Sequence, residues 1–468
     1  MQARFTQGNI MRHIAVMSFT SAIGLAAMFV VSFVDLLFIA RLGNRALAAA
    51  AGYAGTVLFF TQAISIGASI AAGTLVGRSL GEGKPNLAKE YATSVLQIGM
   101  IFYIPITIFL WFAAPYILSF LGAKGETLDA AIVYLKVLIP SIPFMMIAMV
   151  SSAVLRARGD AKNPMNIMLI ASIINAILDP IFIFDWGLGL GIGGAALASV
   201  ISRLTMMGLG YYFVRYRHNG FAPMSLPMMR RDAITIFGLS VPAILTNFAT
   251  PIGSVILVKS MSQYGDHLQA ALAVINQIVP VFFGVVFALS GAVGPIIAQN
   301  YGAKLYGRIR QTVIDANLFN LAWVVTASIL LIFMQNLIVK GFKLEGNAAD
   351  LVHVFCNYIS FSFVFAGAVF VSNAVFNNLG HPFYSTIINW VRNTIGLFPF
   401  VLIGQYFFDE KGILIGQAVG TALTAVVAVW LSLIVVERVA HGLEKRVRLR
   451  DTIKRIPLIH ALYNKGPM

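Results

Sequence analysis

The chain has 468 residues, of which 59% are hydrophobic and only 11% are charged. Soluble domains carry roughly 25% charged residues, so this composition excludes a soluble fold. The formal net charge of +15 is compatible in principle with nucleic-acid binding. The Lys and Arg residues nevertheless follow a membrane pattern, described below, and we expect no nucleic-acid partner.

Apolar runs long enough to cross a bilayer recur along the whole chain. About 20 apolar residues span the hydrocarbon core as a helix, and lipid offers no partners to backbone polar groups, so spanning segments must be helical. We therefore predict an all-α membrane protein. Its twelve expected transmembrane helices cover 14–40, 46–75, 91–113, 128–155, 164–185, 191–214, 233–260, 268–298, 311–337, 349–377, 384–408 and 412–437.

Lys and Arg residues set the orientation of these helices. With the N-terminus placed in the cytoplasm, 23 of them fall in cytoplasmic segments and far fewer in outer segments. This asymmetry is the positive-inside rule. It predicts a multi-pass protein of the cell inner membrane with both termini in the cytoplasm. The basic stretch Lys445–Arg450 is expected to rest on anionic lipid head groups. We expect a monomer.

Few residues carry cofactor or catalytic chemistry. The chain has one cysteine, Cys356, and its seven histidines show no metal-ligand spacing. No phosphate-binding glycine motif of the Walker A type is present, so we expect no ATP site. We therefore expect no metal and no cofactor, and energy that comes from an ion gradient. No His/Asp or Ser/His grouping lies at one membrane face, so we expect no enzyme activity.

The two halves of the chain form a repeat with an offset of 221 residues. Gly73, Gly81 and Gly159 map onto Gly294, Gly302 and Gly380. Each half holds six helices, so the halves have the same orientation and are related by an axis along the membrane normal. We expect two six-helix lobes around a central cleft. The expected parts are an N-terminal lobe (1–214), a cytoplasmic linker (215–232), a C-terminal lobe (233–437) and a basic tail (438–468).

Two intramembrane carboxylates belong to the N-terminal lobe only. Asp35 corresponds to about Ile256 or Leu257 in the second half, and Asp179 corresponds to Leu397. A charged residue within a membrane helix costs about 2.5–3.5 kcal/mol, and it is a functional hypothesis by default. The alternative is a protonated acid that makes a packing hydrogen bond. Two acids in one lobe, both missing from the matching lobe, favour function.

The spacing around Asp179 points the same way. Asn175 and Asp179 are four residues apart and share one helix face. An amide can donate to a carboxylate and accept from a carboxylic acid, so it suits both protonation states. Pro180 removes a backbone donor and loosens a nearby carbonyl. Ser199, after the glycine-rich turn, is placed where it can face the same cavity.

The same residues carry a family resemblance that covers nearly the whole chain. The segments concerned are Val34-Asp35, Gly77–Gly83, Arg156–Pro164, Asn175–Pro180 and Gly194–Ala196. The chain resembles the multidrug and toxic compound extrusion (MATE) transporters, in particular the bacterial DinF-like branch. Members of this family are secondary antiporters that expel organic cations and other amphipathic drugs in exchange for H⁺ or Na⁺.

The resemblance implies a cation site in the N-terminal lobe. In the DinF-like branch it comprises residues that fall here on Asp35, Tyr134, Asn175, Asp179 and Ser199. The NorM-like branch carries carboxylates on helices 7 and 10. Spans 233–260 and 349–377 have none except Asp350 at one end, so that site is expected to be absent. These features favour H⁺ as the coupling ion, with Na⁺ as the alternative.

Further polar residues within the expected helices are candidates for the substrate cavity: Asn276, Gln277, Asn373, Asn377, Asn393 and Arg203. Interhelical hydrogen bonds are the other explanation for the amides. Pairing with a carboxylate is the other explanation for Arg203. The first helix lacks the proline that many family members have, so any bend there must use Gly24 or the Thr20-Ser21 pair.

Three other functions remain open at this point. A Na⁺-coupled exporter would use the same oxygen-rich residues. A flippase for lipid-linked sugars, from the wider superfamily, would need cavity arginines, for which Arg203 and Arg392 are the candidates. A membrane-embedded enzyme would need a catalytic cluster. The sequence does not determine the substrates, the stoichiometry or the side to which the cleft opens.

Overall fold

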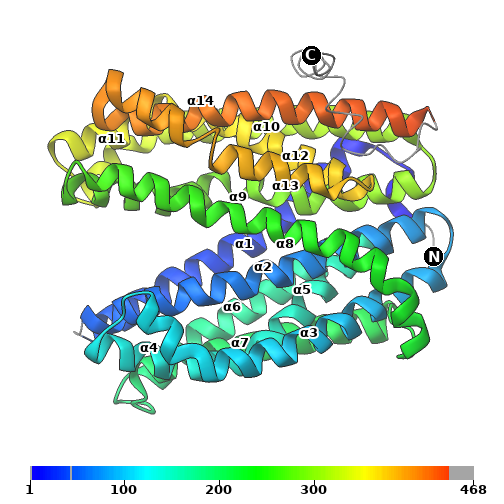
Figure 1. Ribbon diagram of the computed structural model, residues 1–468, viewed down its shortest axis with the longest axis horizontal. Coiled ribbons are helices and arrows are strands. Elements are labelled where there is room, and N and C mark those ends of the chain that lie inside the picture. Colours follow the sequence, from blue (N-terminus) through cyan, green and yellow to red (C-terminus); the bar gives the residue numbers. More distant parts are fainter. Residues whose placement is uncertain (1–2, 43–44, 442–468) are drawn as a thin grey trace, which may run out of the picture.

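The computed structural model of the protein describes residues 3–42 and 45–441. The predicted basic stretch Lys445–Arg450 lies outside these residues. The described chain is a bundle of long helices arranged in two groups, which lie close together at the end that holds the N-terminus and diverge toward the other end (Figure 1).

The N-terminal lobe contains the first seven α-helices (Figure 1). They are α1 (Ile10–Arg41), α2 (Arg45–Gly81), α3 (Pro85–Phe120), α4 (Gly125–Leu138), α5 (Ile142–Ala157), α6 (Lys162–Ile183) and α7 (Gly191–Tyr212). The short 3₁₀-helix η1 (Arg4–Thr6) precedes α1, and the 3₁₀ turn η2 (Ile139–Ser141) joins α4 to α5. The π-helical segment η3 (Phe213–Arg217) follows α7.

The C-terminal lobe repeats this order. Its helices are α8 (Leu226–Ser262), α9 (Asp266–Gly302), α10 (Tyr306–Gly341), α11 (Gly346–Asn357), α12 (Phe363–Asn378), α13 (Pro382–Asn393) and α14 (Phe398–Ala440). The 3₁₀ turn η4 (Ile359–Ser362) joins α11 to α12, as η2 joins α4 to α5. Each of these two pairs forms one interrupted span.

The predicted fold class is confirmed. In the described part of the chain, eleven helical stretches are long and apolar enough to cross a membrane. The last of them, Pro382–Ala440, has 59 residues. At 1.5 Å per residue, a straight helix of that length would measure about 90 Å, far more than one bilayer core. The chain reverses instead at Phe408 and Asp409, whose backbone angles are not helical, so this stretch supplies two crossings.

Two helix boundaries differ from the prediction. Helix α8 begins at Leu226, inside the expected linker 215–232, because Pro227 stands in the first turn, where a helix does not use the missing N–H. The span expected at 384–408 is broken between α13 and α14. A Cβ on Gly396 in this break would lie 2.8 Å from the hydroxyl of Thr424, so a glycine allows the broken segment to pack tightly against α14.

Helix α1 belongs to both lobes. At its N-terminal end, Ile14 and Met17 are fully buried, and they belong to a hydrophobic cluster built from helices of the C-terminal lobe. Toward its other end, α1 packs on α6 of the N-terminal lobe, where the rings of Phe38 and Phe184 are 5.8 Å apart. One rigid element therefore touches the core of each lobe.

Candidate functional site

The two intramembrane acids meet. The carboxyl groups of Asp35 on α1 and Asp179 on α6 lie within hydrogen-bonding range of one another. Asn175, one turn before Asp179, donates from Nδ2 to Asp179 Oδ1 at 3.4 Å. Asp35 Oδ1 and Asp179 Oδ2 are buried and have no hydrogen-bond partner in the described part of the chain. Two carboxyl groups at this separation need a proton or a cation between them, because both cannot stay charged and unpaired.

Tyr134 on α4 lies beside this pair. It is close enough to Asp35, Asp179 and Arg203 for their charges to act on its hydroxyl group, and the structure describes no hydrogen bond for it. Ser199 is half-buried on α7, one helical turn before Arg203, and the structure likewise describes no hydrogen bond for its hydroxyl group. The acids, the amide and the tyrosine are thus grouped, while any participation of Ser199 stays a prediction.

The candidate residues of the C-terminal lobe do not form one polar wall. Asn276 and Gln277 are exposed on α9. Asn373 is buried and accepts a hydrogen bond at 3.0 Å from Asn389 on the next helix, which is the interhelical explanation. Asn393 donates to Asn389 O within α13.

Two residues in this lobe deserve separate mention. Asn377 keeps a buried Oδ1 without a hydrogen-bond partner in the described chain, so it is the amide here that most needs one. Asp350, the acid at the end of a predicted span, lies 3.7 Å from Lys411 with its side chain mostly exposed. Its position does not match a buried ion site.

The lobes are joined at one end by a pair of contacts related by the repeat. A Cβ on Gly81 would lie 2.1 Å from Gln299 O, and a Cβ on Gly302 would lie 2.1 Å from Arg78 O. The 221-residue offset relates Gly81 to Gly302, and it also relates Arg78 to Gln299. The ends of α2 and α9 therefore cross at the pseudo-two-fold axis, and only glycine fits at the crossing.

Hydrogen bonds between the lobes follow the same symmetry. Arg78 donates from Nε and Nη2 to Asn378 O, at the end of α12, at 3.0 and 2.8 Å. Gln299 donates from Nε2 to Ala157 O, at the end of α5, at 2.7 Å. Each lobe thus offers a side chain to the last carbonyl groups of a helix in the other lobe, groups that a helix leaves without partners of its own.

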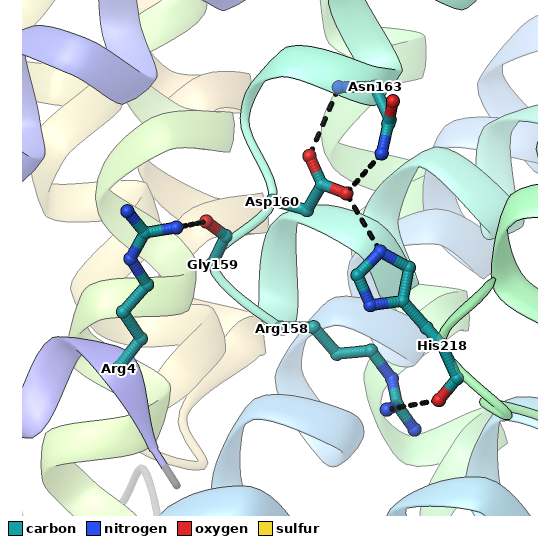
Figure 2. A network of polar contacts seen from close by, with 6 residues as sticks. All are labelled: Arg4, Arg158, Gly159, Asp160, Asn163 and His218. Carbon is teal, nitrogen blue, oxygen red and sulfur yellow. Dashed lines mark hydrogen bonds and ion pairs between the residues drawn. The ribbon is translucent and has the colours of Figure 1, made fainter. Parts of the chain in front are cut away.

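The N-terminal segment lies across this closure. Phe5 is buried, and its N–H donates to Gln299 Oε1 at 2.7 Å. Arg308 of the C-terminal lobe donates to Phe5 O at 3.1 Å. On the other side, Arg4 donates to Gly159 O at 2.9 Å (Figure 2). The segment is therefore held by both lobes at once.

The loop after α5 is tied further. Asp160 pairs with the ring of His218 at 2.8 Å, and Asn163 donates to the same carboxylate (Figure 2). Arg158 donates to His218 O at 3.1 Å. These contacts fasten the α5–α6 loop to the connection between the lobes.

Replacing one crossing glycine is expected to hinder closure at this end. Gly302→Ala places a Cβ against Arg78 O, and overpacking of this kind costs about 1–3 kcal/mol. A cysteine introduced by Ser79→Cys, at a buried position of α2, should then be labelled faster by a maleimide. Gly307→Ala is the matched control, because a Cβ there meets nothing within 4 Å. Equal labelling in the two variants would contradict the assigned crossing.

Sequence reasoning missed the closure and one group of side chains in the N-terminal lobe. Ser65 on α2 hydrogen-bonds to the hydroxyl of Tyr103 on α3 at 2.6 Å, and that hydroxyl donates to Thr61 O at 2.7 Å. Hydroxyl residues are common in membrane helices as packing partners, so neither residue stood out. The four-residue spacing of Thr61 and Ser65 was the available signal.

Comparison with known proteins agrees with the repeat. The family model described as MatE matches residues 21–181 and again residues 242–402. The two matches begin 221 residues apart, which is the offset of the internal repeat. Together they cover more than half of the chain.

Similar proteins align over most of their length. A protein named FAD transporter from Shewanella oneidensis is 27% identical over 422 residues, which are 89% of this chain and 93% of that protein. Probable multidrug resistance protein YpnP from Bacillus subtilis is 23% identical, over 88% of this chain and 92% of that protein. A solved structure described as the outward-facing conformation of a multidrug resistance MATE family transporter gives a TM-score of 0.86 at 20% identity, covering 93% of this chain and 98% of that one.

Proposed function

Because the chain belongs to the multidrug and toxic compound extrusion (MATE) family of membrane transporters, we propose that it is a secondary active antiporter that exports amphipathic drugs, especially organic cations, in exchange for H⁺. The observation that carries the proposal is the contact between Asp35 and Asp179 inside one lobe. The contact supplies a place for protons in a chain that transports and that shows no ATP-binding motif.

The acid pair supplies the chemistry of exchange. When the pair loses protons, two negative charges stand close together in a site of low polarity, and a cationic drug or a Na⁺ ion relieves their repulsion. When the pair is protonated, its demand for a cation disappears. Because the two groups are this close, their protons bind as a coupled pair. Drug and protons therefore compete for the N-terminal lobe.

Helix α1 connects this competition to movement of the lobes. Asp35 lies toward the C-terminal end of α1, opposite α6, whereas Ile14 and Met17 near its other end are buried in the core of the C-terminal lobe. A shift of Asp35 relative to Asp179 moves a helix that is anchored in the other lobe. We propose that α1 carries the protonation signal to the closure formed by Gly81, Gly302 and the N-terminal segment.

The orientation of the structure follows from the positive-inside assignment. With both termini in the cytoplasm, the closed end, where Arg4 and Phe5 lie, is the cytoplasmic end. The protein is then in an outward-facing state, the state in which protons from outside reach the acid pair and the drug leaves. The expected inner-membrane location and the monomeric state belong to the same proposal.

The coupling ion is tested in vesicles that contain the purified protein. We expect an imposed pH gradient, without Na⁺, to drive uptake of a fluorescent organic cation, and a Na⁺ gradient without a pH gradient to drive none. The physical reason is that the acid pair lies in the N-terminal lobe and that Asp350, in the other lobe, is exposed. Transport that requires Na⁺ and persists without a pH gradient would establish the Na⁺-coupled alternative instead.

A flavin dinucleotide is a second candidate substrate. The Shewanella relative bears the name FAD transporter, and such a molecule carries phosphate groups that need a cation in the site. Arg203, within a predicted membrane helix of the N-terminal lobe, favours this candidate. The vesicle assay distinguishes the two, because FAD is itself fluorescent and its uptake can be followed under the same pH gradient.

A further inference from the structure

A small cavity in the N-terminal lobe lies next to the acid pair and plays no part in the exchange described above. It is bounded by α2, α5 and α7, and its volume is about 30 Å³. Its lining includes the polar side chains Thr61, Gln62, Ser65 and Arg203, together with the apolar Ile142 and Met145. Gln62 is exposed, so the cavity is reached from outside the lobe. It has room for a terminal group of a substrate, not for a whole drug.

Arg203 brings a positive charge to this cavity with little to balance it. Its Nη1 donates to Ser141 Oγ at 3.0 Å, and Ser141 in turn donates to Leu138 O at 2.6 Å. No carboxylate of the described chain lies within 4.0 Å of the guanidinium group, and its other N–H groups have no protein partner there. A guanidinium group carries five N–H donors in a planar fork that matches carboxylate and phosphate oxygens.

The groups around Arg203 suit an oxyanion. Gln62 has no hydrogen-bond partner in the described residues, so its amide N–H groups can be donated to a ligand. Ser65 and Thr61 are held by Tyr103 on the neighbouring helix, which fixes the wall of the cavity. A charged side chain inside a membrane protein usually faces a cavity and serves a ligand or a partner, and here the partner is missing.

From these contacts we infer that Arg203 and Gln62 form a subsite for an oxyanion, the carboxylate or phosphate group of a transported substrate. The inference rests on the proposed export function and adds a substrate class to it. Arg203 and the acid pair both act on Tyr134, so they share one region of the lobe. A zwitterionic amphiphile fits this region best: its cation meets the acid pair, and its oxyanion meets Arg203.

The repeat supports a special role for this position. The 221-residue offset places Thr424 opposite Arg203 in the C-terminal lobe. Thr424 is buried and donates to Gly420 O within its own helix at 2.8 Å, so the fold does not need an arginine there. Arg203→Thr is therefore a natural replacement, and Arg203→Lys keeps the charge while it removes the planar fork.

The experiment uses substrate pairs that differ in the oxyanion alone. Norfloxacin is compared with its methyl ester, flavin mononucleotide is compared with riboflavin, and ethidium serves as a cation without an oxyanion. All are measured in vesicles that contain the full-length protein under a pH gradient. For Arg203→Thr we expect the KM for the oxyanion member of at least one pair to rise roughly tenfold or more, as for loss of a charge-assisted hydrogen bond. The ester, riboflavin and ethidium should keep their values.

The outcomes separate this inference from the proposed function. A loss confined to norfloxacin assigns a carboxylate to the subsite, and a loss confined to flavin mononucleotide assigns a phosphate. Equal loss for both members of each pair, or no loss, would overturn the subsite while ethidium transport by the wild type still supports the exporter. If Arg203→Thr fails to fold, Gln62→Met and Arg203→Lys carry the test, each with a smaller rise in KM for the oxyanion member alone.

Discussion

Asp35→Asn is expected to reduce drug export to the background level while the protein still folds and inserts. Asparagine has nearly the volume of aspartic acid and can donate a hydrogen bond to Asp179, so it resembles a carboxyl group that never releases its proton. The pair then cannot alternate between charged and neutral forms. Efflux of a fluorescent cation from cells, normalised to the amount of protein in the membrane, measures the effect.

The control for this variant is Asp350→Asn. Asp350 is exposed and lies 3.7 Å from Lys411, and such surface pairs contribute little. Its replacement should leave efflux unchanged. Drug export at the wild-type level by Asp35→Asn would remove Asp35 from the mechanism.

Asp179→Leu is expected to abolish transport without loss of stability. The replacement copies Leu397, the aligned residue of the C-terminal lobe. It removes a carboxyl group whose Oδ2 is buried without a partner, and burial of an unpaired polar group costs free energy. Asn175 then loses the acceptor for its Nδ2, which limits any gain. The melting temperature in detergent and efflux in cells should be measured on the same variant.

The reciprocal replacement is the matched control. Leu397 is buried in a hydrophobic cluster of the C-terminal lobe, so Leu397→Asp adds an unpaired acid and should lower the melting temperature. If Asp179→Leu loses stability and transport together, Asp179 is a packing residue. If it keeps efflux, Asp35 acts without it.

The sequence predicted the helices well where composition alone decides the structure. Apolar length determined twelve spans, and their number and repeat are confirmed. Helix ends were predicted less well, because long helices extend beyond the apolar core into polar flanks, as α2 does to Gly81. Pro227 was taken as part of a linker, although proline is favoured in the first turn of a helix. The break before α14 depends on contacts of Gly396 with distant residues, which a local pattern does not contain.

The candidate site was predicted in part. The i, i+4 spacing predicted that Asn175 would contact Asp179, and the absence of matching acids in the second half indicated one special lobe. Contact between Asp35 and Asp179 depends on how α1 packs against α6, and packing is not visible in sequence spacing. The cavity at Arg203 was missed for the same reason, since its polar walls come from three different helices.

The closure between the lobes shows what symmetry adds. The glycines Gly81 and Gly302 were recognised as a repeated pair, but their purpose was not. Only in three dimensions does each meet the backbone of the other repeat, beside Arg78 and Gln299. A feature that lies on a symmetry axis appears twice in the sequence and once in the structure.

Proton release upon substrate binding tests the central claim most directly. The purified protein is placed in weakly buffered detergent solution, an organic cation such as ethidium is added, and the pH is recorded together with binding. The account predicts that the wild-type protein releases protons as the cation binds and that Asp35→Asn and Asp179→Leu release fewer or none. Cation binding by the wild type without proton release, or equal release by both variants, would contradict exchange at the acid pair.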